Sequence, residues 1–264
     1  GRPSSAGPPA RRVELPTYAF RRRRYWPRAL APGTGDVASA GLGATGHPLL
    51  QAVVPLADDD AYLFTARLSA TTHPWLADHT VGSTVLLPGT AYLELAARAG
   101  DQAGCARVEE LTLLAPMVLP ATGAVQLQLS LAAPDADGHR ALTVHGRPEA
   151  ADGAAPWTLH ATGLLAPAEE APRGASSAEA TAWPPPGAEP VPLDGFYASL
   201  AEDGFAYGPA FQGLRAVWRQ GDTLYAEAAL PEGGDDRAAA YTLHPALLDA
   251  ALHALACALV GGAG

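Results

Sequence analysis

The sequence predicts an α+β fold in which two apolar helices are each buried by antiparallel strands. The first observation is a series of short runs in which apolar and polar residues alternate, as half-buried strands require. The second is a pair of helical segments, residues 88–99 and 245–260, that begin at proline and are apolar on most sides. The third is size, because 264 residues that are 48% hydrophobic can build one large core or two smaller ones.

Residues 1–46 are predicted to form a linker ahead of the first folded unit, because Gly, Pro, Ala and Arg dominate them. Eight of the 17 basic residues, all of them arginine, fall within residues 1–28. We interpret this stretch as a solvated segment that docks on a neighbouring domain, since a basic binding tail rarely contains interleaved aromatic side chains. The aromatic anchors are Tyr18, Phe20, Tyr25 and Trp26.

Residues 47–165 are predicted to form the first unit. Alternation predicts a strand over 61–70, and a shorter strand is expected over 83–87. The helix that follows begins at Pro88-Gly89, and Gly100 is expected to stop it. Its few polar residues recur every four positions, so we expect Glu94 to pair with Arg98.

Three further strands are expected in the same unit, over residues 125–131, 140–147 and 156–165. Asp137-Gly138 between the first two is a hairpin signal. Together these strands predict an antiparallel sheet wrapped around the helix.

Residues 166–192 are rich in Ala, Pro, Glu and Ser, and are predicted to link the first unit to a second, 193–264. The second unit is expected to contain a helix over 194–202 capped by Asp194. Strands over 214–219 and 222–230 should follow, and then the helix over 245–260. These are few strands to wrap a helix, so we expect strands after residue 264 to complete the sheet.

Composition excludes several function classes. Residues 29–264 contain nine arginines against 26 acidic residues, which argues against nucleic acid as a partner. The sequence contains no run of 18 apolar residues, so no membrane span is predicted. The N-terminal stretch lacks the apolar core of a secretory signal. The two cysteines, Cys105 and Cys257, are too few for a disulfide scaffold, which favours a reducing cytoplasm.

Two distant residues offer proton-transfer chemistry. His79 precedes the first apolar helix, and Asp249 lies among Leu and Ala in the second. A carboxyl group in such surroundings is costly to ionise unless it is paired. A neutral imidazole and a protonated carboxyl that meet in one apolar pocket favour elimination or addition of water beside a carbonyl group. His253, one helical turn after Asp249, could orient it by hydrogen bonding.

The remaining histidines are interpreted as structural. His73, His145 and His160 occur in strand or turn contexts without acidic partners, and His244 precedes a helix as a cap-region residue. No spacing of these residues predicts a metal site.

Three segments carry a resemblance to a known family. His79 followed nine residues later by Pro88-Gly89 resembles the HxxxGxxxxP motif of dehydratase domains of modular polyketide synthases. Residues 204–211, which contain Tyr207-Gly208-Pro209, resemble the family's GYxYGPxF motif, and residues 249–253 resemble its DxxxQ/H motif. The segment Leu15-Pro16-Thr17-Tyr18-Ala19-Phe20 resembles the linker that follows an acyltransferase domain in such synthases.

Two positions depart from the family pattern. Ser83 occupies the place of the motif glycine, with Gly82 one position early. If that place requires a positive φ, serine would be strained there and the orientation of His79 would change. Phe205 stands where the family has tyrosine, which keeps the ring and removes a hydroxyl.

The resemblance implies a double hotdog fold, two antiparallel sheets each wrapped around a buried helix. It implies dehydration of a 3-hydroxyacyl thioester to an enoyl thioester, with the substrate on the phosphopantetheine arm of an acyl carrier protein. His79 would remove the C2 proton and Asp249 would expel the hydroxyl as water. The domain would need no cofactor, would neighbour acyltransferase, ketosynthase and ketoreductase domains, and would form a homodimer.

Assisting roles follow from this chemistry. Backbone N–H groups after Pro88, near Gly89, and around Gly208 are candidate donors to the thioester oxygen. Tyr207 could donate a hydrogen bond to the substrate hydroxyl or to the acid. Pro88 and Pro209 are expected to hold their loops rigid. Outside the site, Arg215 and Arg219 are candidates for carrier docking.

Three alternatives remain. A double-bond-shifting isomerase needs no acid to expel water, so the presence of Asp249 counts against it. An inactive spacer that only docks synthase domains would have a filled cleft or a displaced His79. A stand-alone thioester hydrolase is disfavoured by the synthase-like N-terminal linker.

Overall fold

The computed structural model describes residues 37–150, 155–168, 182–233 and 235–260. The aromatic anchors expected in the N-terminal linker lie outside these residues, as do residues 169–181 of the linker predicted over 166–192. Within the described part of the chain, no helix has the length and apolar character needed to cross a membrane.

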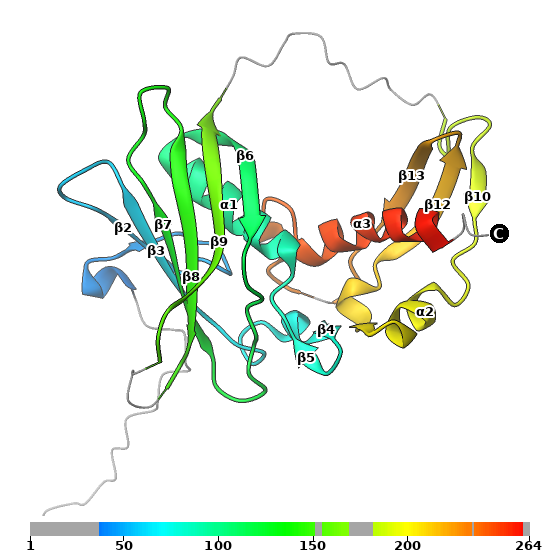
Figure 1. Cartoon of the computed structure of the whole chain (residues 1–264), viewed down its shortest axis with the longest axis horizontal. Coiled ribbons are helices and arrows are strands. Elements are labelled where there is room, and N and C mark those ends of the chain that lie inside the picture. The colour runs from blue at the N-terminus through cyan, green and yellow to red at the C-terminus, as the bar shows by residue number, and fades with distance from the viewer. Residues whose placement is uncertain (1–36, 151–154, 169–181, 234, 261–264) are drawn as a thin grey trace, which may run out of the picture. The chain divides into compact units, whose positions relative to one another are not determined.

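An antiparallel sheet of seven strands forms the first unit, in the order β1-β2-β3-β7-β8-β9-β6 (Figure 1). Helix α1 (Gly89–Ala103) packs against it, chiefly on β6 and β9. The strands are β1 (Gly43–Ala44), β2 (Ala52–Pro55), β3 (Tyr62–Leu68), β6 (Cys105–Leu113), β7 (Val125–Leu131), β8 (Arg140–Pro148) and β9 (Thr158–Pro167).

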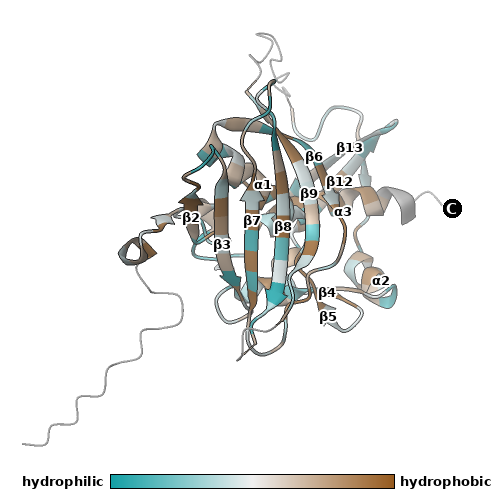
Figure 2. Cartoon of the chain, turned by 60° about the vertical axis from the view of Figure 1, so that its left-hand side comes forward, coloured by the Kyte–Doolittle hydropathy of each residue, from teal (hydrophilic) through white to brown (hydrophobic). Residues whose placement is uncertain are grey.

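Alternation along the strands produces the core between sheet and helix. In β7 every second residue is buried, and Figure 2 shows the matching change of hydropathy along β7 and β8. Phe64 of β3 faces Leu129 of β7 in the ladder, and both are fully buried with Leu95 of α1. The strands predicted over 61–70, 125–131, 140–147 and 156–165 are thereby confirmed, as is the turn at Asp137-Gly138, where φ of Gly138 is 83°.

Helix α1 runs past the predicted stop. Gly100 lies inside the helix, and Gly104, with φ of 74°, ends it. A Cβ atom on Gly100 would lie 2.8 Å from the carbonyl oxygen of Cys105. The absence of a side chain at Gly100 therefore lets β6 begin directly against the helix, and the left-handed turn falls to the next glycine.

A three-stranded antiparallel sheet and helix α3 (Pro245–Val260) form the second unit. The strands, in the order β10-β12-β13, are β10 (Glu189–Val191), β12 (Leu214–Gln220) and β13 (Thr223–Ala228), and α3 contacts β12 and β13 (Figure 1). Helix α2 (Phe196–Glu202) starts at Gly195, whose φ is 70°, so the expected cap at Asp194 is wrong. Glycine at this position supplies the left-handed entry that the chain requires.

The sheets extend into both segments predicted as linkers. Strand β1 pairs with β2 although it lies within residues 1–46, and β10 pairs with β12 although it lies within 166–192. Neither short strand shows an alternating pattern, so composition alone suggested a linker. The division of the chain into domains stays a prediction, as does the expectation of strands after residue 264.

A third sheet joins the two units. Strand β11 (Phe205–Tyr207) pairs with β4 (His79–Val81), which pairs with β5 (Thr84–Val85). Short 3₁₀ helices precede β1 and β4, follow β11 and lie between β13 and α3; they are η1 (Val37–Ala40), η2 (Pro74–Asp78), η3 (Pro209–Phe211) and η4 (Ala238–Ala240).

Glu94 of α1 makes a second connection between the units. Its buried carboxylate accepts hydrogen bonds from the backbone N–H groups of Thr242 and Leu243, at 2.7 and 3.1 Å, just before α3. It also accepts one from Nε2 of His47 at 2.9 Å. The expected pair with Arg98 is wrong, because the Arg98 guanidinium donates to the carbonyl oxygen of Thr45 instead.

Candidate active site

His79 opens β4, and its ring is oriented by a backbone carbonyl. Nδ1 lies 2.9 Å from the carbonyl oxygen of Leu86. Because a carbonyl oxygen only accepts, Nδ1 carries the proton of this hydrogen bond, and in the neutral ring Nε2 is left as a free base. Burial lowers the pKa of His79, and this effect outweighs the opposing influence of Asp249 and of the Leu86 carbonyl.

The departure at Ser83 leaves His79 undisturbed. Gly82 takes the left-handed conformation at the β4–β5 turn, with φ of 62°, and among the described residues positive φ is confined to glycine. The residue that needs conformational freedom is therefore Gly82, and Ser83 has ordinary backbone geometry.

Two aromatic rings flank the imidazole of His79. The ring centroid of Phe211 lies 5.1 Å from it, and that of Tyr207, directly opposite His79 in the β4–β11 pair, lies 5.6 Å from it. Burial, with the nearby charge of Asp249, raises the pKa of Tyr207 to about 12. The phenol therefore stays protonated at neutral pH and can donate a hydrogen bond.

Asp249 and His253 lie one turn apart on α3. Nε2 of His253 is 3.2 Å from Oδ2 of Asp249, but the angles are not those of a hydrogen bond, so the bond predicted to orient Asp249 is not formed. Both atoms are buried and lack a hydrogen-bond partner among the described residues. On the other side of the ring, Nδ1 of His253 lies 3.4 Å from the hydroxyl of Tyr197.

The structure brings the two predicted proton-transfer groups into one neighbourhood. The Tyr207 ring contacts the imidazole of His253, at 4.4 Å between centroids, as well as that of His79. The charge of Asp249 acts on the pKa values of both His79 and Tyr207. His79 and His253, which are 174 positions apart in the chain, thus both contact the Tyr207 ring, and Asp249 lies one helical turn before His253.

A cavity of about 350 Å³ opens beside His79. Gly89, the first residue of α1, lines it, while Asp249 is not among its lining residues. The first N–H groups of a helix have no partner within the helix, so Gly89 offers a donor to this cavity. Pro88 is the N-cap, with the extended backbone that starts the helix. The other lining residues are Leu86, Leu87, Tyr92, Leu113, Leu114, Ala115 and Pro116.

Two models of known families match the chain over most of its length. One, described as polyketide synthase dehydratase domain, matches residues 47–147. The other, described as polyketide synthase dehydratase N-terminal domain, matches residues 175–264. A crystal structure of the dehydratase domain from the terminal module of the rifamycin polyketide synthase is 48% identical, with a TM-score of 0.78. The match covers 85% of this chain and 81% of that domain.

This chain belongs to the family of polyketide synthase dehydratase domains.

The likeness extends to a curated relative and to a pair of solved variants. The pikromycin synthase component PikAII of Streptomyces venezuelae is 58% identical over 91% of this chain, which spans only 6% of its length. Two structures of the CurK dehydratase are 28% identical, with TM-scores of 0.65 and 0.66, and cover 80% of this chain and 74% of theirs. Both are described as inactive mutants, one with His changed to Phe and one with Asp changed to Asn. The double hotdog prediction is confirmed by these neighbours.

Gly208 of the dehydratase domain has a different role from the one expected. Its N–H group donates to the carbonyl oxygen of Asp78 at 2.7 Å, so this donor is engaged within the protein. Of the two backbone donors predicted for a thioester oxygen, Gly89 is therefore the better candidate. Pro209 begins η3, as a rigid turn-maker would.

Sequence reasoning missed several residues of the dehydratase site. Phe211 belongs to the GYxYGPxF match but was given no role, and Tyr197 lies outside every motif. Leu113 and Leu114 were missed because β6 was not predicted. The burial along β6 does not alternate, and two register shifts interrupt its pairing with β9.

The other histidines have structural roles. His73 is fully buried, and its Nε2 donates to the carbonyl oxygen of Pro48 at 2.9 Å. His160 donates from Nδ1 to the carbonyl oxygen of Ala115 at 3.0 Å. Nδ1 of His244 accepts the N–H of Ala246 in the first turn of α3, which confirms its predicted place in the helix cap.

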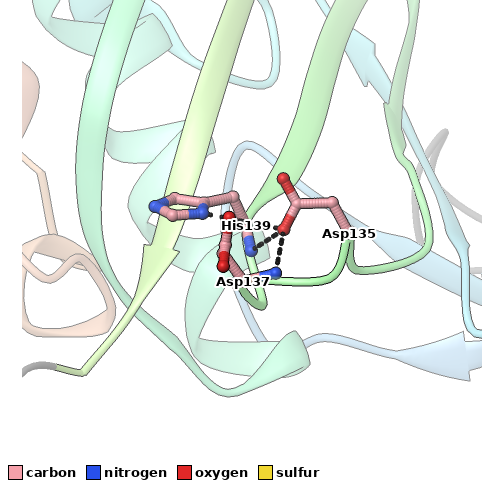
Figure 3. A group of neighbouring side chains, drawn as sticks. All are labelled: Asp135, Asp137 and His139. Atoms are coloured by element: carbon pink, nitrogen blue, oxygen red, sulfur yellow. Dashed lines mark hydrogen bonds and ion pairs between the residues drawn. The ribbon is translucent and has the colours of Figure 1, made fainter.

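One cluster of potential metal ligands occurs in the described residues, at the β7–β8 turn (Figure 3). Its members are Asp135, Asp137 and His139, and both carboxylates are exposed. Oδ1 of Asp135 accepts the backbone N–H groups of Asp137 and His139, at 2.9 and 2.8 Å. These bonds are those of an Asx turn, so the cluster is explained by the hairpin.

Proposed function

We propose that this dehydratase domain converts a 3-hydroxyacyl thioester into an enoyl thioester by removing water. The observation that carries the proposal is that the Tyr207 ring contacts both His79, with Nε2 free, and His253, the neighbour of Asp249, and that the charge of Asp249 acts on His79 and Tyr207. One group accepts a proton and the other donates one, which is what elimination beside a carbonyl requires.

His79 acts as the base. Its lowered pKa keeps the ring neutral near pH 7, and the bond from Nδ1 to Leu86 directs Nε2 toward the substrate. Nε2 takes the C2 proton, and the electron pair left on C2 becomes the new double bond. Negative charge that develops on the thioester oxygen is stabilised by the N–H of Gly89 at the positive end of α1.

Asp249 acts as the acid. In its protonated form it gives its proton to the departing β-hydroxyl, and the C3–O bond breaks to release water. Tyr207 donates a hydrogen bond to the same hydroxyl, and the ring of His253 packs against that of Tyr207 at 4.4 Å between centroids. The proton gained by His79 then returns to Asp249, directly or through solvent, which resets the site.

The substrate arrives on the phosphopantetheine arm of an acyl carrier protein, and no cofactor takes part in the reaction. The cavity beside His79, lined by Leu113 and Leu114, would accept this apolar chain. The domain works beside acyltransferase, ketosynthase and ketoreductase domains of a cytoplasmic synthase, as a homodimer, and Arg215 and Arg219 take part in carrier docking. The inactive His and Asp mutants of the CurK dehydratase support the same two kinds of residue as essential.

Two alternatives are less well supported. A spacer would have a filled cleft or a displaced His79, but His79 lines an open cavity and Ser83 causes no strain. An isomerase would not need Asp249, whose charge acts on the pKa values of both Tyr207 and His79.

The test is incubation of the domain with a 3-hydroxyacyl carrier-protein thioester, followed by mass spectrometry of the acyl-carrier product. We expect the product to be lighter by the mass of one water molecule. His79→Phe and Asp249→Asn should each slow the reaction by about 10²- to 10⁴-fold. His139→Phe and Asp222→Asn, which change surface residues of the same kinds, are the controls. Full activity in either site variant would refute the proposed roles.

A further inference from the structure

Asp78, the residue directly before His79, holds the backbone of residues 208–210. Its carbonyl oxygen accepts the N–H of Gly208 at 2.7 Å, and its Oδ2 accepts the N–H of Ala210 at 2.9 Å. The carbonyl oxygen and the carboxylate of Asp78 thus bind both backbone N–H groups of the Gly208-Pro209-Ala210 segment, because proline has no N–H group. The segment belongs to the second unit, whereas Asp78 ends η2 in the first.

The contact also explains why residue 208 is glycine. Its φ is −82°, a value that any residue can adopt, so backbone conformation does not require glycine here. A Cβ atom at this position would instead lie 2.4 Å from both Cγ and Oδ1 of Asp78. The need for glycine therefore comes from the close approach of the Asp78 carboxylate.

The segment held by Asp78 lies between the two rings that flank His79. Tyr207 precedes Gly208 directly, and Phe211 follows Ala210 and is fully buried. The N–H of Phe211 donates to the carbonyl oxygen of Gly208, so the short turn moves as a unit. Any displacement of residues 208–210 would carry both rings away from the imidazole.

We propose that Asp78 is a positioning residue, which places Tyr207 and Phe211 against the imidazole of His79 by binding the N–H groups of Gly208 and Ala210. The catalytic meaning of this placement rests on the proposed function of His79 as the base. The placement itself is a property of the fold, and it can be measured without turnover.

The ring contacts have a measurable electrostatic consequence. Burial is the main reason why the pKa of His79 lies below its ordinary value, and Tyr207 and Phe211 supply part of that burial. From α3, the charge of Asp249 raises this pKa and that of His253 lowers it. Release of the two rings would hydrate the imidazole, so its pKa should rise toward the ordinary value of about 6.5.

The experiment compares Asp78→Ala with Asp78→Asn in the whole domain, by NMR titration of the His79 ring and by steady-state kinetics. Alanine removes the acceptor for the Ala210 N–H, whereas the asparagine side chain keeps one carbonyl oxygen. For Asp78→Ala we expect a raised His79 pKa and a kcat about 10- to 100-fold lower, with KM little changed. Asp78→Asn should have a His79 pKa and a kcat close to those of the native domain.

Matched variants keep the result interpretable. Gly208→Ala forces the same segment away from Asp78 and should raise the His79 pKa in the same direction, so it replaces Asp78→Ala should that variant fail to fold. Asp222→Ala, in the exposed β12–β13 turn, removes an equal charge and should change neither the His79 pKa nor kcat.

Two results would overturn the proposal. One is an unchanged His79 titration in folded Asp78→Ala or Gly208→Ala protein. The other is an Asp78→Asn variant as impaired as Asp78→Ala, which would make the charge rather than the acceptor responsible. Failure of the proposed function would look different, because His79→Phe would then remain active whatever the titration shows.

Discussion

At the scale of single residues, the bond from His79 to Leu86 decides which nitrogen acts. The protonated Nδ1 is held by the backbone, so only Nε2 can receive a proton. The motif around His79 contains no sign of this bond, because the acceptor is a main-chain carbonyl seven positions later. Sequence could propose His79 as the base, but the structure was needed to propose which of its nitrogen atoms reacts.

The lowered pKa of His79 predicts the acid side of the pH profile. Only the neutral ring can take a proton, so kcat/KM should be maintained down to about pH 6.5 and lost as pH falls through the lower pKa of the buried ring. The measurement is kcat/KM of a pantetheine thioester between about pH 4.5 and pH 8. A midpoint above the ordinary histidine value would contradict the assignment of His79 as a buried base.

The β4–β5 turn gives a second prediction at this scale. Gly82 has φ of 62°, so Gly82→Ala should lower the free energy of unfolding by about 1 kcal/mol, the cost of a left-handed backbone for a residue with a Cβ. Ser83→Gly, which restores the family pattern, should leave kcat/KM unchanged. Chemical denaturation and steady-state kinetics test the pair, and a large gain of activity in Ser83→Gly would mean that serine does misalign His79.

At the scale of elements, the placement of α3 against α1 depends on Glu94. Burial alone would raise the pKa of this carboxyl group, but hydrogen bonds from His47, Leu243 and Thr242 outweigh burial and lower it. The carboxylate is 4% exposed, so it acts as an internal acceptor for the chain that leads into α3. Asp249 lies in the second turn of that helix, and its position follows from this connection.

Loss of the Glu94 carboxylate should therefore destabilise the whole domain. Glu94→Ala leaves two backbone N–H groups and the Nε2–H of His47 without their acceptor, at about 1–3 kcal/mol each, so we expect a loss of at least about 3 kcal/mol. Glu109→Ala removes an exposed acid on β6 and should cost less than about 1 kcal/mol. Urea denaturation of the two variants gives the comparison, and equal losses would refute the role of Glu94.

The same carboxylate predicts how stability depends on pH. The folded-state pKa of Glu94 is depressed, so its contribution is fully present above the unfolded value of about 4.3. This contribution should be lost as pH falls through the folded-state value. Unfolding free energies of the native domain and Glu94→Gln should therefore converge at acidic pH, and a difference that grows on acidification would have the wrong sign.

Sequence predicted those elements whose pattern depends on local contacts. Strands β3, β7 and β8 have one face against the core, which produces alternation, and α3 is recognised by its proline start and apolar length. The end of α1 was misplaced because two glycines, Gly100 and Gly104, compete for the same signal. Close packing against β6 explains the glycine at position 100, and left-handed geometry explains the glycine at position 104. Only the coordinates distinguish these two causes.

The candidate site, like the fold, could be predicted from sequence only in part. Motif order identified His79 and Asp249, but their common neighbour Tyr207 acquires its role from strand pairing between the two units. Asp78 could not be found from sequence, because its function depends on the approach of a segment 130 residues later. Polar residues that bind backbone of another unit leave no periodic pattern.

At the scale of the whole molecule, the two proposed catalytic groups, His79 and Asp249, lie on different units, and two connections hold the units together. One is the β11-β4-β5 sheet, which brings Tyr207 beside His79. The other is Glu94, which holds the start of α3. Because neither unit contains both proposed proton-transfer groups, the proposed dehydration would require the two units together.

Net charge is a further property of the whole chain, and it predicts how the carrier protein is captured. The formal charge is −10, and residues 29–264 are more acidic still. If the proposed carrier protein is acidic as well, long-range attraction would not drive its encounter with this domain. Raising ionic strength from about 0.1 M to about 1 M shortens the Debye length from about 10 Å to about 3 Å and screens the repulsion.

We therefore expect kcat/KM for a carrier-bound substrate to stay constant or rise over this range of salt. The same acyl group on free pantetheine, which lacks the acidic carrier, is the control and should show no rise. A steep fall with salt for the carrier-bound substrate alone would mean that a local arginine contact dominates the encounter. In that case Arg215→Ala, on the exposed start of β12, should abolish the fall, and capture would depend on a patch rather than on covalent tethering within the synthase.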